Sequence, residues 1–327
     1  MIEILNGGFE TTIQDYPGRI GYWNIGIPPS GPLDNVSFRL ANLLVGNASG
    51  EAGLEMTVLG PSLKFNADTL IALTGANLSP LLNGKPAEMW KAFPVTVGDI
   101  LSFGLCRWGC RAYMAIAGGI DIPTVLGSKS TYMKGLIGGL DGQKLKTGDR
   151  LTVERTLKPL EELAGRRVRE EIIPKFPRDC EIKVMLGPQD DYLEDDFLLE
   201  TYALGQYPWK VSAMLDRVGV RLNALEHKWK SAPNRPPSGA HPSNINLVYC
   251  GLGIINILGD VPTIIGVDGI SLTGYVSAAT IIGAEMWKVG QLKPNDTVRF
   301  KAVNISEAQA TRRSIDASLD ESCIITS

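Results

Sequence analysis

Short apolar runs separated by turn-forming residues are the main pattern along this chain. Four of these runs, at 69–73, 112–117, 181–185 and 253–258, are bounded by Gly, Pro, Asn or Asp, which is the pattern of β-strands. In addition, Asn83-Gly84 is the dipeptide typical of a two-residue hairpin turn. The pattern therefore predicts a mainly β protein.

Helical periodicity is limited to a few segments. Asp34 is in position to cap a helix over 35–45, whose apolar residues fall on one face. Residues 188–203 form a weaker, acidic helix candidate. Ser306 and Gln309 have the spacing of a capping box, which predicts a polar helix near the end of the chain. We therefore expect few short helices beside the strands.

Changes in composition along the chain suggest its domains. Apolar periodicity lapses in the charged stretch 157–177, and 226–240 has the composition of a long loop. A length of 327 residues favours two domains of about 150 residues each. We expect a first domain over 1–165, a second over 178–303, and a C-terminal polar helix and tail over 304–327. The helix near Ser306–Leu319 is expected to serve partner docking more than core packing.

One string of five residues occurs twice, which indicates a duplication. Ala-Glu-Met-Trp-Lys stands at 87–91 and again at 284–288, and Leu-Thr-Gly precedes the two copies at 73–75 and 272–274. An Asp follows each Trp at the same spacing. These matched spacings predict two tandem copies of one unit, with a substrate site that the two halves share.

Composition and charge exclude several classes of protein. Apolar residues make up 44% of the chain and charged residues 20%, and the net charge is −3, so we expect no nucleic acid and no membrane as a partner. The apolar runs are too short to span a bilayer, and the N-terminus lacks the pattern of a signal peptide. Five cysteines at irregular spacings do not make a disulfide framework. We expect a cytoplasmic protein.

Several common chemical motifs are absent. The sequence has no Gly-x-x-x-x-Gly-Lys-Ser/Thr loop for phosphate and no Gly-x-Ser-x-Gly elbow for a nucleophile. Gly135–Gly142 is rich in glycine but does not follow a strand and open a helix, so it does not predict a dinucleotide site. Cys106 and Cys110 have no second pair of ligands beside them, so we expect no metal site.

The polar residues gather instead in turn-rich motifs, and these motifs resemble a known family. They are similar to the allophanate hydrolase subunit 2 family, and among its relatives most similar to the carboxyltransferase domain of urea carboxylase. The C subunit of 5-oxoprolinase is a related branch. The resemblance runs from about Ile4 to Phe300. It rests on the strings Gln14–Trp23, Pro28–Asp34, Ala115–Gly119, His241–Ile245 and Glu285–Pro294.

One segment departs from both branches. Members of the family tend to have Gly-Gly before an aromatic residue and a proline after it, whereas this chain has Thr273-Gly274-Tyr275-Val276-Ser277. If this loop contacts the substrate, the substrate can differ from urea.

The resemblance implies a fold and a set of partners. The fold is two tandem duplicated β-barrel-like domains, the second of them cyclophilin-like. The usual partner is a subunit 1 family protein. A carboxylase also needs a biotin carrier and a biotin carboxylase, so the biotin would arrive on a separate carrier protein and ATP would be used by a partner subunit. In the 5-oxoprolinase branch the partner is the lactam-utilisation A subunit.

The candidate residues follow from the chemistry of CO2 transfer to a urea or amide nitrogen. The reaction needs donors for the developing charge, a base for the nitrogen's proton and a pocket that excludes water. Arginines can clamp an oxyanion or a carboxylate, aspartates can act as a base, and the other groups can donate hydrogen bonds to a small polar amide. We predict Asp268, His241 and Arg217 as catalytic residues. We predict Asn244, Ser243, Arg221, Tyr275, Gln14 and Ser30 as substrate-binding residues.

Structural roles are open for several of these residues and their neighbours. Arg19 and Arg217 can instead be buried arginines that pair with the nearby Asp15 and Asp216 to hold turns. Asp34 can be a helix cap alone. The remaining residues with a structural alternative are Trp90 and Trp287 as core aromatics, His241 as an organiser of its loop, and Lys129 as a solvated lysine.

Three functions from different classes remain. The first is the carboxyltransferase subunit of a biotin-dependent N-carboxylase acting on urea or a related amide. The second is the C subunit of an ATP-dependent, 5-oxoprolinase-type lactam hydrolase, which needs no biotin. The third is a non-catalytic regulatory partner of a subunit 1 homologue. In each case we expect the chain to be inactive alone, because it has neither a nucleotide site nor a biotinylation site.

Overall fold

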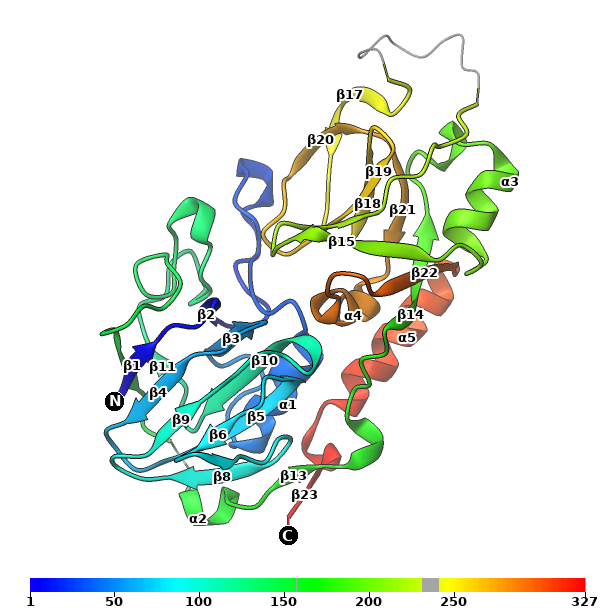
Figure 1. The fold of residues 1–327 in the computed structure, drawn as a ribbon. Coiled ribbons are helices and arrows are strands. Elements are labelled where there is room, and N and C mark those ends of the chain that lie inside the picture. The colour runs from blue at the N-terminus through cyan, green and yellow to red at the C-terminus, as the bar shows by residue number, and fades with distance from the viewer. Residues whose placement is uncertain (157, 231–240, 327) are drawn as a thin grey trace. The chain divides into compact units, whose positions relative to one another are not determined.

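The computed structural model describes residues 1–156, 158–230 and 241–326. The chain forms two compact units, which are considered separately (Figure 1). Unit 1 contains Met1–Gly21, Pro29–Phe176 and Asp316–Ser327, and unit 2 contains Tyr22–Pro28 and Pro177–Ile315. Strands predominate and the helices are few and short, which confirms the predicted mainly β fold.

Unit 1 is built from two antiparallel sheets with one core. The seven-stranded sheet has the order β11-β12-β1-β4-β9-β6-β7, and the five-stranded sheet has the order β2-β3-β10-β5-β8. Apolar side chains from both sheets form a single buried cluster. The strands are β1 (Ile2–Asn6), β2 (Glu10–Gln14), β3 (Gly53–Thr57), β4 (Ser62–Phe65), β5 (Thr69–Asn77), β6 (Leu81–Leu82), β7 (Lys85–Pro86), β8 (Ala92–Val95), β9 (Ile100–Ser102), β10 (Trp108–Ile116), β11 (Ile120–Asp121) and β12 (Arg150–Val153).

The predicted local signals of unit 1 are confirmed. The runs 69–73 and 112–117 lie in β5 and β10, two neighbouring strands of the five-stranded sheet. Asn83 and Gly84 connect β6 to β7 with φ of 50° and 77°, and two positive φ angles in succession are what a type I′ hairpin turn requires. The helix α1 (Asn35–Leu44) packs against β5 and β10.

A buried polar network holds the segment that leads into α1. The Asp34 carboxylate accepts hydrogen bonds from Ser37 N at 2.9 Å and Ser37 Oγ at 2.6 Å, so Asp34 is the predicted cap. The Asp34 N–H donates to the hydroxyl of Tyr113 at 2.8 Å, and that hydroxyl donates to Glu55 at 2.8 Å. Glu55 also faces the buried guanidinium of Arg111 at 3.6 Å. Burial, and then the negative charge of Glu55, raises the pKa of Tyr113 well above its ordinary value, so its hydroxyl stays protonated and can donate.

Unit 2 is built around a closed seven-stranded barrel. The order of its strands is β14-β21-β18-β19-β16-β15-β22, and the parallel pair β14 and β22 completes the ring. Beside the barrel, β17 and β20 form a separate two-stranded sheet. The strands are β14 (Asp179–Leu186), β15 (Trp209–Leu215), β16 (Gly219–Leu222), β17 (Asn244–Tyr249), β18 (Ile254–Leu258), β19 (Val261–Ile265), β20 (Leu272–Tyr275), β21 (Ser277–Ile281) and β22 (Thr297–Ala302). The predicted runs 181–185 and 253–258 fall in β14 and β18.

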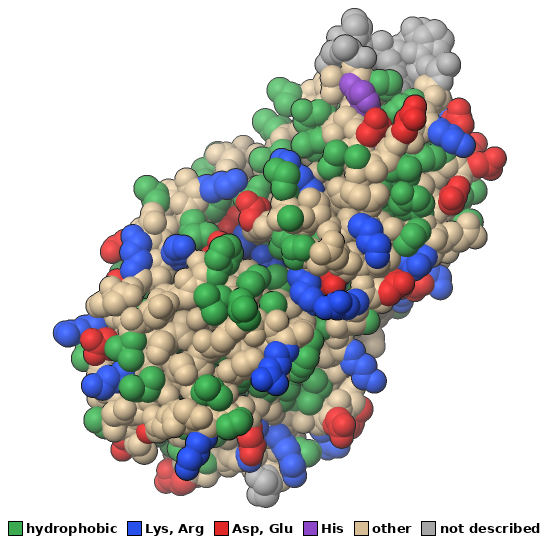
Figure 2. All heavy atoms as spheres, in the orientation of Figure 1, with side chains coloured by type: hydrophobic (Ala, Val, Ile, Leu, Met, Phe, Trp, Pro, Cys, Tyr) green, Lys and Arg blue, Asp and Glu red, His purple; other side chains and the backbone are tan. Residues whose placement is uncertain are grey.

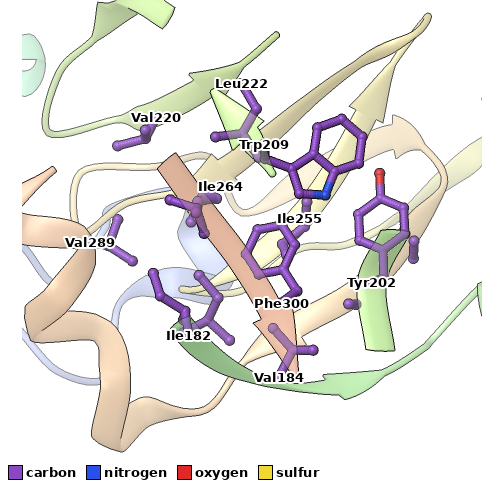
Figure 3. Packing of buried hydrophobic residues seen from close by; sticks show 14 of the residues in the cluster. Ile182, Val184, Tyr202, Trp209, Val220, Leu222, Ile255, Ile264, Val289 and Phe300 are labelled. Atoms are coloured by element: carbon purple, nitrogen blue, oxygen red, sulfur yellow. The ribbon is translucent and has the colours of Figure 1, made fainter. Parts of the chain in front are cut away.

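An aromatic group fills one part of the core of unit 2 (Figure 3). The rings of Tyr202 and Phe300 are nearly parallel, with centroids 6.0 Å apart, and Trp209 lies 5.4 Å from Tyr202. The indole N–H of Trp209 donates to Thr201 O at 2.9 Å, so the buried ring leaves its polar atom paired.

His227 is part of the same aromatic group. Its imidazole lies 5.3 Å from the ring of Phe197 and 5.7 Å from that of Trp229, and the residue is only 4% exposed. Burial lowers the pKa of His227, and this effect outweighs the opposite influence of the Leu225 backbone and of Asp260. His227 is therefore neutral at pH 7.

The repeated strings do not have the same conformation in the two units. Residues 87–91 are irregular, and Trp90 has a φ of 62°. Residues 284–288 instead run through a short 3₁₀ turn, η6 (Gly283–Glu285), into α4 (Met286–Gln291). Trp90 is a buried core residue, as predicted, whereas Trp287 is only partly buried. The matched spacings therefore do not correspond to matched local structure in these segments.

Two helix predictions need correction. Residues 188–203 form three short pieces instead of one helix: η4 (Asp190–Tyr192), α3 (Asp195–Leu198) and the π-helical η5 (Leu199–Ala203). The C-terminal helix α5 (Ile305–Ser318) has its capping box two residues earlier than predicted. Glu307 N donates to Asn304 Oδ1 at 2.9 Å, and Asn304 N donates to Glu307 Oε2 at 3.0 Å. Asparagine is as good a cap as serine, so the upstream pair takes this position.

The residues after α5 pack against unit 1. Leu319 and Cys323 are buried, and β23 (Ile324–Ile325) pairs with β13 (Arg167–Val168) inside unit 1. The helix α5 itself has no buried residue, so the expectation that it serves partner docking more than core packing stays a prediction. The loop predicted over 226–240 lies largely outside the described residues. The remaining helical turns are η1 (Trp23–Ile25), η2 (Met133–Gly135), α2 (Leu160–Leu163), η3 (Glu170–Ile172) and η7 (Glu321–Cys323). Among the described residues, no helix is long and apolar enough to cross a membrane.

We predict that Tyr113→Phe destabilises unit 1. The change removes one buried partner from Asp34 N–H and one from Glu55, and this costs about 1–3 kcal/mol. Urea denaturation should show a lower midpoint with an unchanged slope. Tyr249→Phe is the control, because Tyr249 is 79% exposed and its hydroxyl is in solvent. Equal midpoints for the two variants would contradict the structural role of the network.

We predict that unit 2 loses stability as the pH falls below about 6.5. The folded-state pKa of His227 lies below its ordinary value of 6.5, so between these two values the unfolded chain binds more protons than the folded one. The contribution is complete above pH 6.5 and is lost as the pH falls through the folded pKa. Thermal melts between pH 8 and pH 5 should show a smaller decline for His227→Gln than for the wild type. An equal decline of the melting temperature with pH in the two proteins would rule out this role of His227.

Candidate functional site

The pairing of β17 with β20 brings four predicted residues together in unit 2. Asn244 is the register partner of Tyr275. Val276 N donates to Ser243 O at 2.8 Å, and Asn244 N donates to His241 O at 3.0 Å. The segment His241–Asn244 therefore runs beside the end of β20.

The contacts of His241 define which of its nitrogens carries a proton. Its Nδ1 lies 2.8 Å from Ser243 Oγ and accepts a hydrogen bond from Ser243 N at 3.2 Å. A backbone N–H can only donate, so Nδ1 is the acceptor and the proton of the neutral ring is on Nε2. Nε2 lies 3.7 Å from Asp260 Oδ2, and the side chain is 38% exposed. Figure 2 shows a histidine at the surface close to acidic side chains.

Ser243 holds the loop rather than facing solvent. The residue has 0% exposure, and its Oγ accepts a hydrogen bond from Gly259 N at 3.2 Å in addition to its contact with His241. A substrate has no access to a hydroxyl in this position.

Asn244 and Tyr275 are available to a ligand. Both are partly buried, and within the described part of the chain neither the amide of Asn244 nor the hydroxyl of Tyr275 makes a hydrogen bond. Together with Nε2–H of His241 they make a set of neutral hydrogen-bonding groups at one end of the small sheet.

Asp268 and Arg217 form a buried pair with each other. Arg217 Nε lies 2.8 Å from Asp268 Oδ2 and Nη2 lies 3.2 Å from Oδ1, and the side chains are 2% and 5% exposed. Asp268 N also donates to Arg217 O at 3.0 Å. A carboxylate that accepts from a guanidinium with both oxygens is poorly placed to take a proton from a substrate. The structural alternative for Arg217 is supported, but its partner is Asp268. Asp216 instead accepts from Val218 N and Gly219 N in its own turn.

Arg221 differs from Arg217 in its surroundings. It lies on β16 with an exposed side chain, and its Nη1 is 3.5 Å from the sulfur of Met214. A thioether is a weak acceptor, so this guanidinium remains able to bind an anion.

The two candidates in unit 1 have opposite roles. Gln14 has 0% exposure and uses both ends of its amide: Nε2 donates to Thr12 Oγ1 at 2.9 Å, and Oε1 accepts from Gly31 N at 3.1 Å. Ser30 is 3% exposed, has a φ of 56°, and its Oγ has no hydrogen-bond partner among the described residues. A non-glycine residue held at positive φ is a strained position of the kind found at functional sites.

Asp15 and Arg19 both organise the loop 125–130 of unit 1. The Asp15 carboxylate accepts from Ser128 Oγ and Ser130 Oγ, each at 2.5 Å. Arg19 donates to Ser130 O at 2.8 Å through Nη2, and its Nε also donates within this loop. Both residues therefore have a structural role, which is the open alternative for Arg19, and they share Ser130 as a partner.

Lys129 is held by three oxygens, which corrects the prediction of a solvated lysine. Its Nζ lies 2.6 Å from Glu154 Oε1, 3.2 Å from Glu51 Oε1 and 3.1 Å from Ile120 O. The side chain is 16% exposed. The two glutamates pair with the ammonium group of Lys129 while most of its side chain is buried.

Asp260 and His227 are site neighbours that the sequence does not single out. Asp260 lies in the two-residue turn Gly259-Asp260 between β18 and β19, where a Gly-Asp pair is typical of a turn and gives no sign of chemistry. His227 lies near the end of the irregular segment that follows β16. The only sequence signal for Asp260 and His227 is that the chain has two histidines, each of which needs a hydrogen-bond acceptor for its ring N–H. Within the described ranges, no group of three or more His, Cys, Asp or Glu side chains could hold a metal ion.

Comparison with known proteins places the chain in a family. The model of the carboxyltransferase domain, subdomains A and B, matches residues 25–302. Urea amidolyase of Lachancea kluyveri is 41% identical over 327 residues, which is 97% of this chain and 18% of the relative. The C subunit of 5-oxoprolinase from Escherichia coli is 32% identical over 313 residues, which is 96% of this chain and 94% of the relative.

A solved structure agrees with these matches. The urea carboxylase of Kluyveromyces lactis is 40% identical with a TM-score of 0.90, over 98% of this chain and 29% of that chain. The chain therefore spans about a fifth to a third of these urea-processing relatives and nearly all of the 5-oxoprolinase C subunit. The family model covers most of the chain, and the relatives confirm the resemblance seen in the motifs, so this chain belongs to the family of the carboxyltransferase domain, subdomains A and B.

Proposed function

We propose that the chain is the carboxyltransferase part of a biotin-dependent N-carboxylase and moves CO2 from carboxybiotin to the nitrogen of urea or a related amide. The observation that carries this proposal is the order of similarity among the relatives. Two urea amidolyases are 41% and 40% identical to the chain, whereas two 5-oxoprolinase C subunits are 32% and 28% identical.

The groups at the end of the β17–β20 sheet fit the ureido oxygen of biotin. His241 Nε2–H, the Asn244 amide and the Tyr275 hydroxyl are neutral donors, and such donors stabilise charge that develops on an oxygen. Carboxybiotin would supply the CO2 to be transferred. Ser30 Oγ has no hydrogen-bond partner in the described part of the chain, but it is buried, so we assign it no contact with the substrate.

The pairing described above changes the roles that we assign to Arg217 and Asp268. Both oxygens of Asp268 are occupied by Arg217, so the pair holds two loops, 216–219 and 266–269, in place. Arg221, with its exposed guanidinium, takes the role of an anion clamp. His241 acts as a hydrogen-bond donor, because its other nitrogen is occupied by Ser243.

The proposed partners follow from the same relatives. The chain would work with a subunit 1 family protein, a biotin carrier and a biotin carboxylase, and ATP would be used by the partner. We propose that this assembly is cytoplasmic and that the chain alone is inactive.

A second function is that of the C subunit of a 5-oxoprolinase-type lactam hydrolase, which would work with the lactam-utilisation A subunit. Two 5-oxoprolinase C subunits are among the relatives, at 32% and 28% identity. The higher identity of the urea amidolyases favours the first function.

Transfer from a labelled carrier distinguishes the two functions. A biotin carrier loaded with ¹⁴C-carboxylate by a biotin carboxylase should pass the label to urea only when the chain is added. The isolated chain with ATP, bicarbonate and urea should produce no carboxylated urea. Transfer that does not depend on the chain would refute the proposal. Hydrolysis of 5-oxoproline by the chain together with the other 5-oxoprolinase subunits would select the alternative.

We predict that His241→Ala and Asn244→Ala each lower the transfer rate by about 10²–10³-fold, the usual cost of removing one donor to a developing charge. The melting temperature should change little, because both side chains are partly exposed. Asn246→Ala is the matched control: Asn246 lies on the same strand with an exposed side chain. Equal loss in all three variants would count against the assigned donors.

We predict that Arg217→Ala destabilises unit 2 by about 3–5 kcal/mol, because it leaves the Asp268 carboxylate buried without its counter-ion. Arg221→Ala should leave stability within about 0.5 kcal/mol of the wild type, since surface substitutions usually do. Chemical denaturation measures both. A stable Arg217→Ala protein with lost activity would restore a catalytic role for Arg217.

A further inference from the structure

Both histidines of the chain meet one carboxylate, that of Asp260. Its Oδ1 lies 3.4 Å from His227 Nδ1 and accepts a hydrogen bond from His227 N at 3.1 Å. Its Oδ2 lies 3.7 Å from His241 Nε2. Asp260 itself comes from the turn between β18 and β19, on the rim of the closed barrel.

Each histidine has a second partner at its other nitrogen. His227 Nε2 lies 2.8 Å from the hydroxyl of Tyr202, and His241 Nδ1 lies 2.8 Å from Ser243 Oγ. Tyr202 is fully buried in the aromatic core, whereas His241 reaches solvent. The contacts therefore run in series from Tyr202 in the core, through His227 and Asp260, to His241 at the surface.

The donors and acceptors along this line are consistent with one another. If Tyr202 O–H donates to His227 Nε2, then His227 Nδ1–H faces Asp260. From the other end, the backbone of Ser243 makes His241 Nδ1 an acceptor, so Nε2–H also faces Asp260. A carboxylate between two N–H groups has a donor facing each oxygen, and neither ring has to present an acceptor to it.

We infer that Asp260 is a positioning residue, anchored by His227 and Tyr202, that holds the ring orientation and the Nε2–H tautomer of His241. This inference rests on the proposed function only for the identity of the ligand. Carboxylates fix the tautomer and orientation of metal-binding histidines in this way, and their loss there lowers activity by about 10–100-fold; we expect an effect of similar size here.

The same residue types could suggest a Ser-His-Asp nucleophile, and the geometry argues against this. Ser243 has 0% exposure, and its Oγ already accepts the N–H of Gly259. A nucleophile must be reachable by its substrate. The serine lies on the buried side of His241, and the exposed group is the imidazole.

The anchor is rigid because the rings around His227 enclose it. Phe197 and Trp209 lie 5.3 and 6.1 Å from the imidazole, and its ring is stacked with that of Tyr202. Rotation of His227 would need space in a packed core. Asp260 is therefore held by a backbone N–H and a fixed ring, and His241 takes its orientation from Asp260 and Ser243.

NMR of the full chain labelled with ¹⁵N-histidine tests this inference without any assay of activity. The chain has two histidines, so all four ring nitrogens can be assigned. We expect the Nδ1–H tautomer for His227 and the Nε2–H tautomer for His241. The Nδ1–H tautomer at His241 in the wild-type protein would overturn the inference.

Asp260→Asn gives the second readout. The amide keeps the shape but loses one acceptor, so we expect a mixture of tautomers at His241 and a fall of about 10–100-fold in kcat of carboxyl transfer with little change in KM. Asp216→Asn is the matched control, because Asp216 is also a turn aspartate of unit 2 but caps only backbone N–H groups. It should leave the tautomers unchanged. An unchanged His241 tautomer in Asp260→Asn would refute the positioning role.

Failure of the proposed function can be told apart from failure of the positioning role. If the wild type shows the expected tautomers but transfers no carboxyl group to urea, the proposed function fails and the positioning role stands. If Asp260→Asn does not fold, His227→Gln removes the anchor and keeps Asp260. It should broaden the signals of the His241 ring nitrogens, and a sharp wild-type spectrum of His241 in that variant would refute the role of the anchor.

Discussion

A carboxylate buried in a β-structure has to be hydrogen-bonded on its oxygens, because desolvating an unpaired charge costs several kcal/mol. In unit 1, Glu55 meets this requirement with the Tyr113 hydroxyl and Leu33 N, and these bonds fix the segment that leads into α1. In unit 2, Asp268 meets it with Arg217. The loops that carry the candidate residues are thus held by internal ion pairs and hydrogen bonds, which leaves other groups to face a ligand.

Because buried polar groups must be paired, some candidate residues hold the fold and others keep donors for a ligand. Gln14, Arg217 and Asp268 use their polar atoms within the fold, and Ser243 is buried. His241, Asn244, Tyr275 and Arg221 keep polar atoms that the described protein does not use fully. Such donors can stabilise charge on an oxygen, which is what the proposed carboxyl transfer from a ureido group would require. A base for the substrate nitrogen does not come from Asp268 in this arrangement.

The sequence predicts those parts of the fold that depend on local rules. The strands in 69–73 and 253–258, the Asn83-Gly84 turn and the Asp34 cap follow from periodicity and turn chemistry. Partners across the fold cannot be predicted in this way. Local reasoning pairs Arg217 with its neighbour Asp216, whereas the residue that binds it is 51 positions away. Asp260 has only the signature of a turn, because its two histidine partners come from other segments of the chain.

The charge of the donors also bears on the choice between urea and a lactam acid. Urea is neutral, whereas 5-oxoproline carries a carboxylate, which a site would match with a guanidinium. Arg217 is already bound to Asp268, so that match would fall to Arg221, an exposed residue with a weak contact to a methionine sulfur. The neutral groups His241 Nε2–H, Asn244 and Tyr275 suit an uncharged amide without further change. If the end of the β17–β20 sheet is the site, as we propose, its neutral donors support the proposed urea or amide substrate.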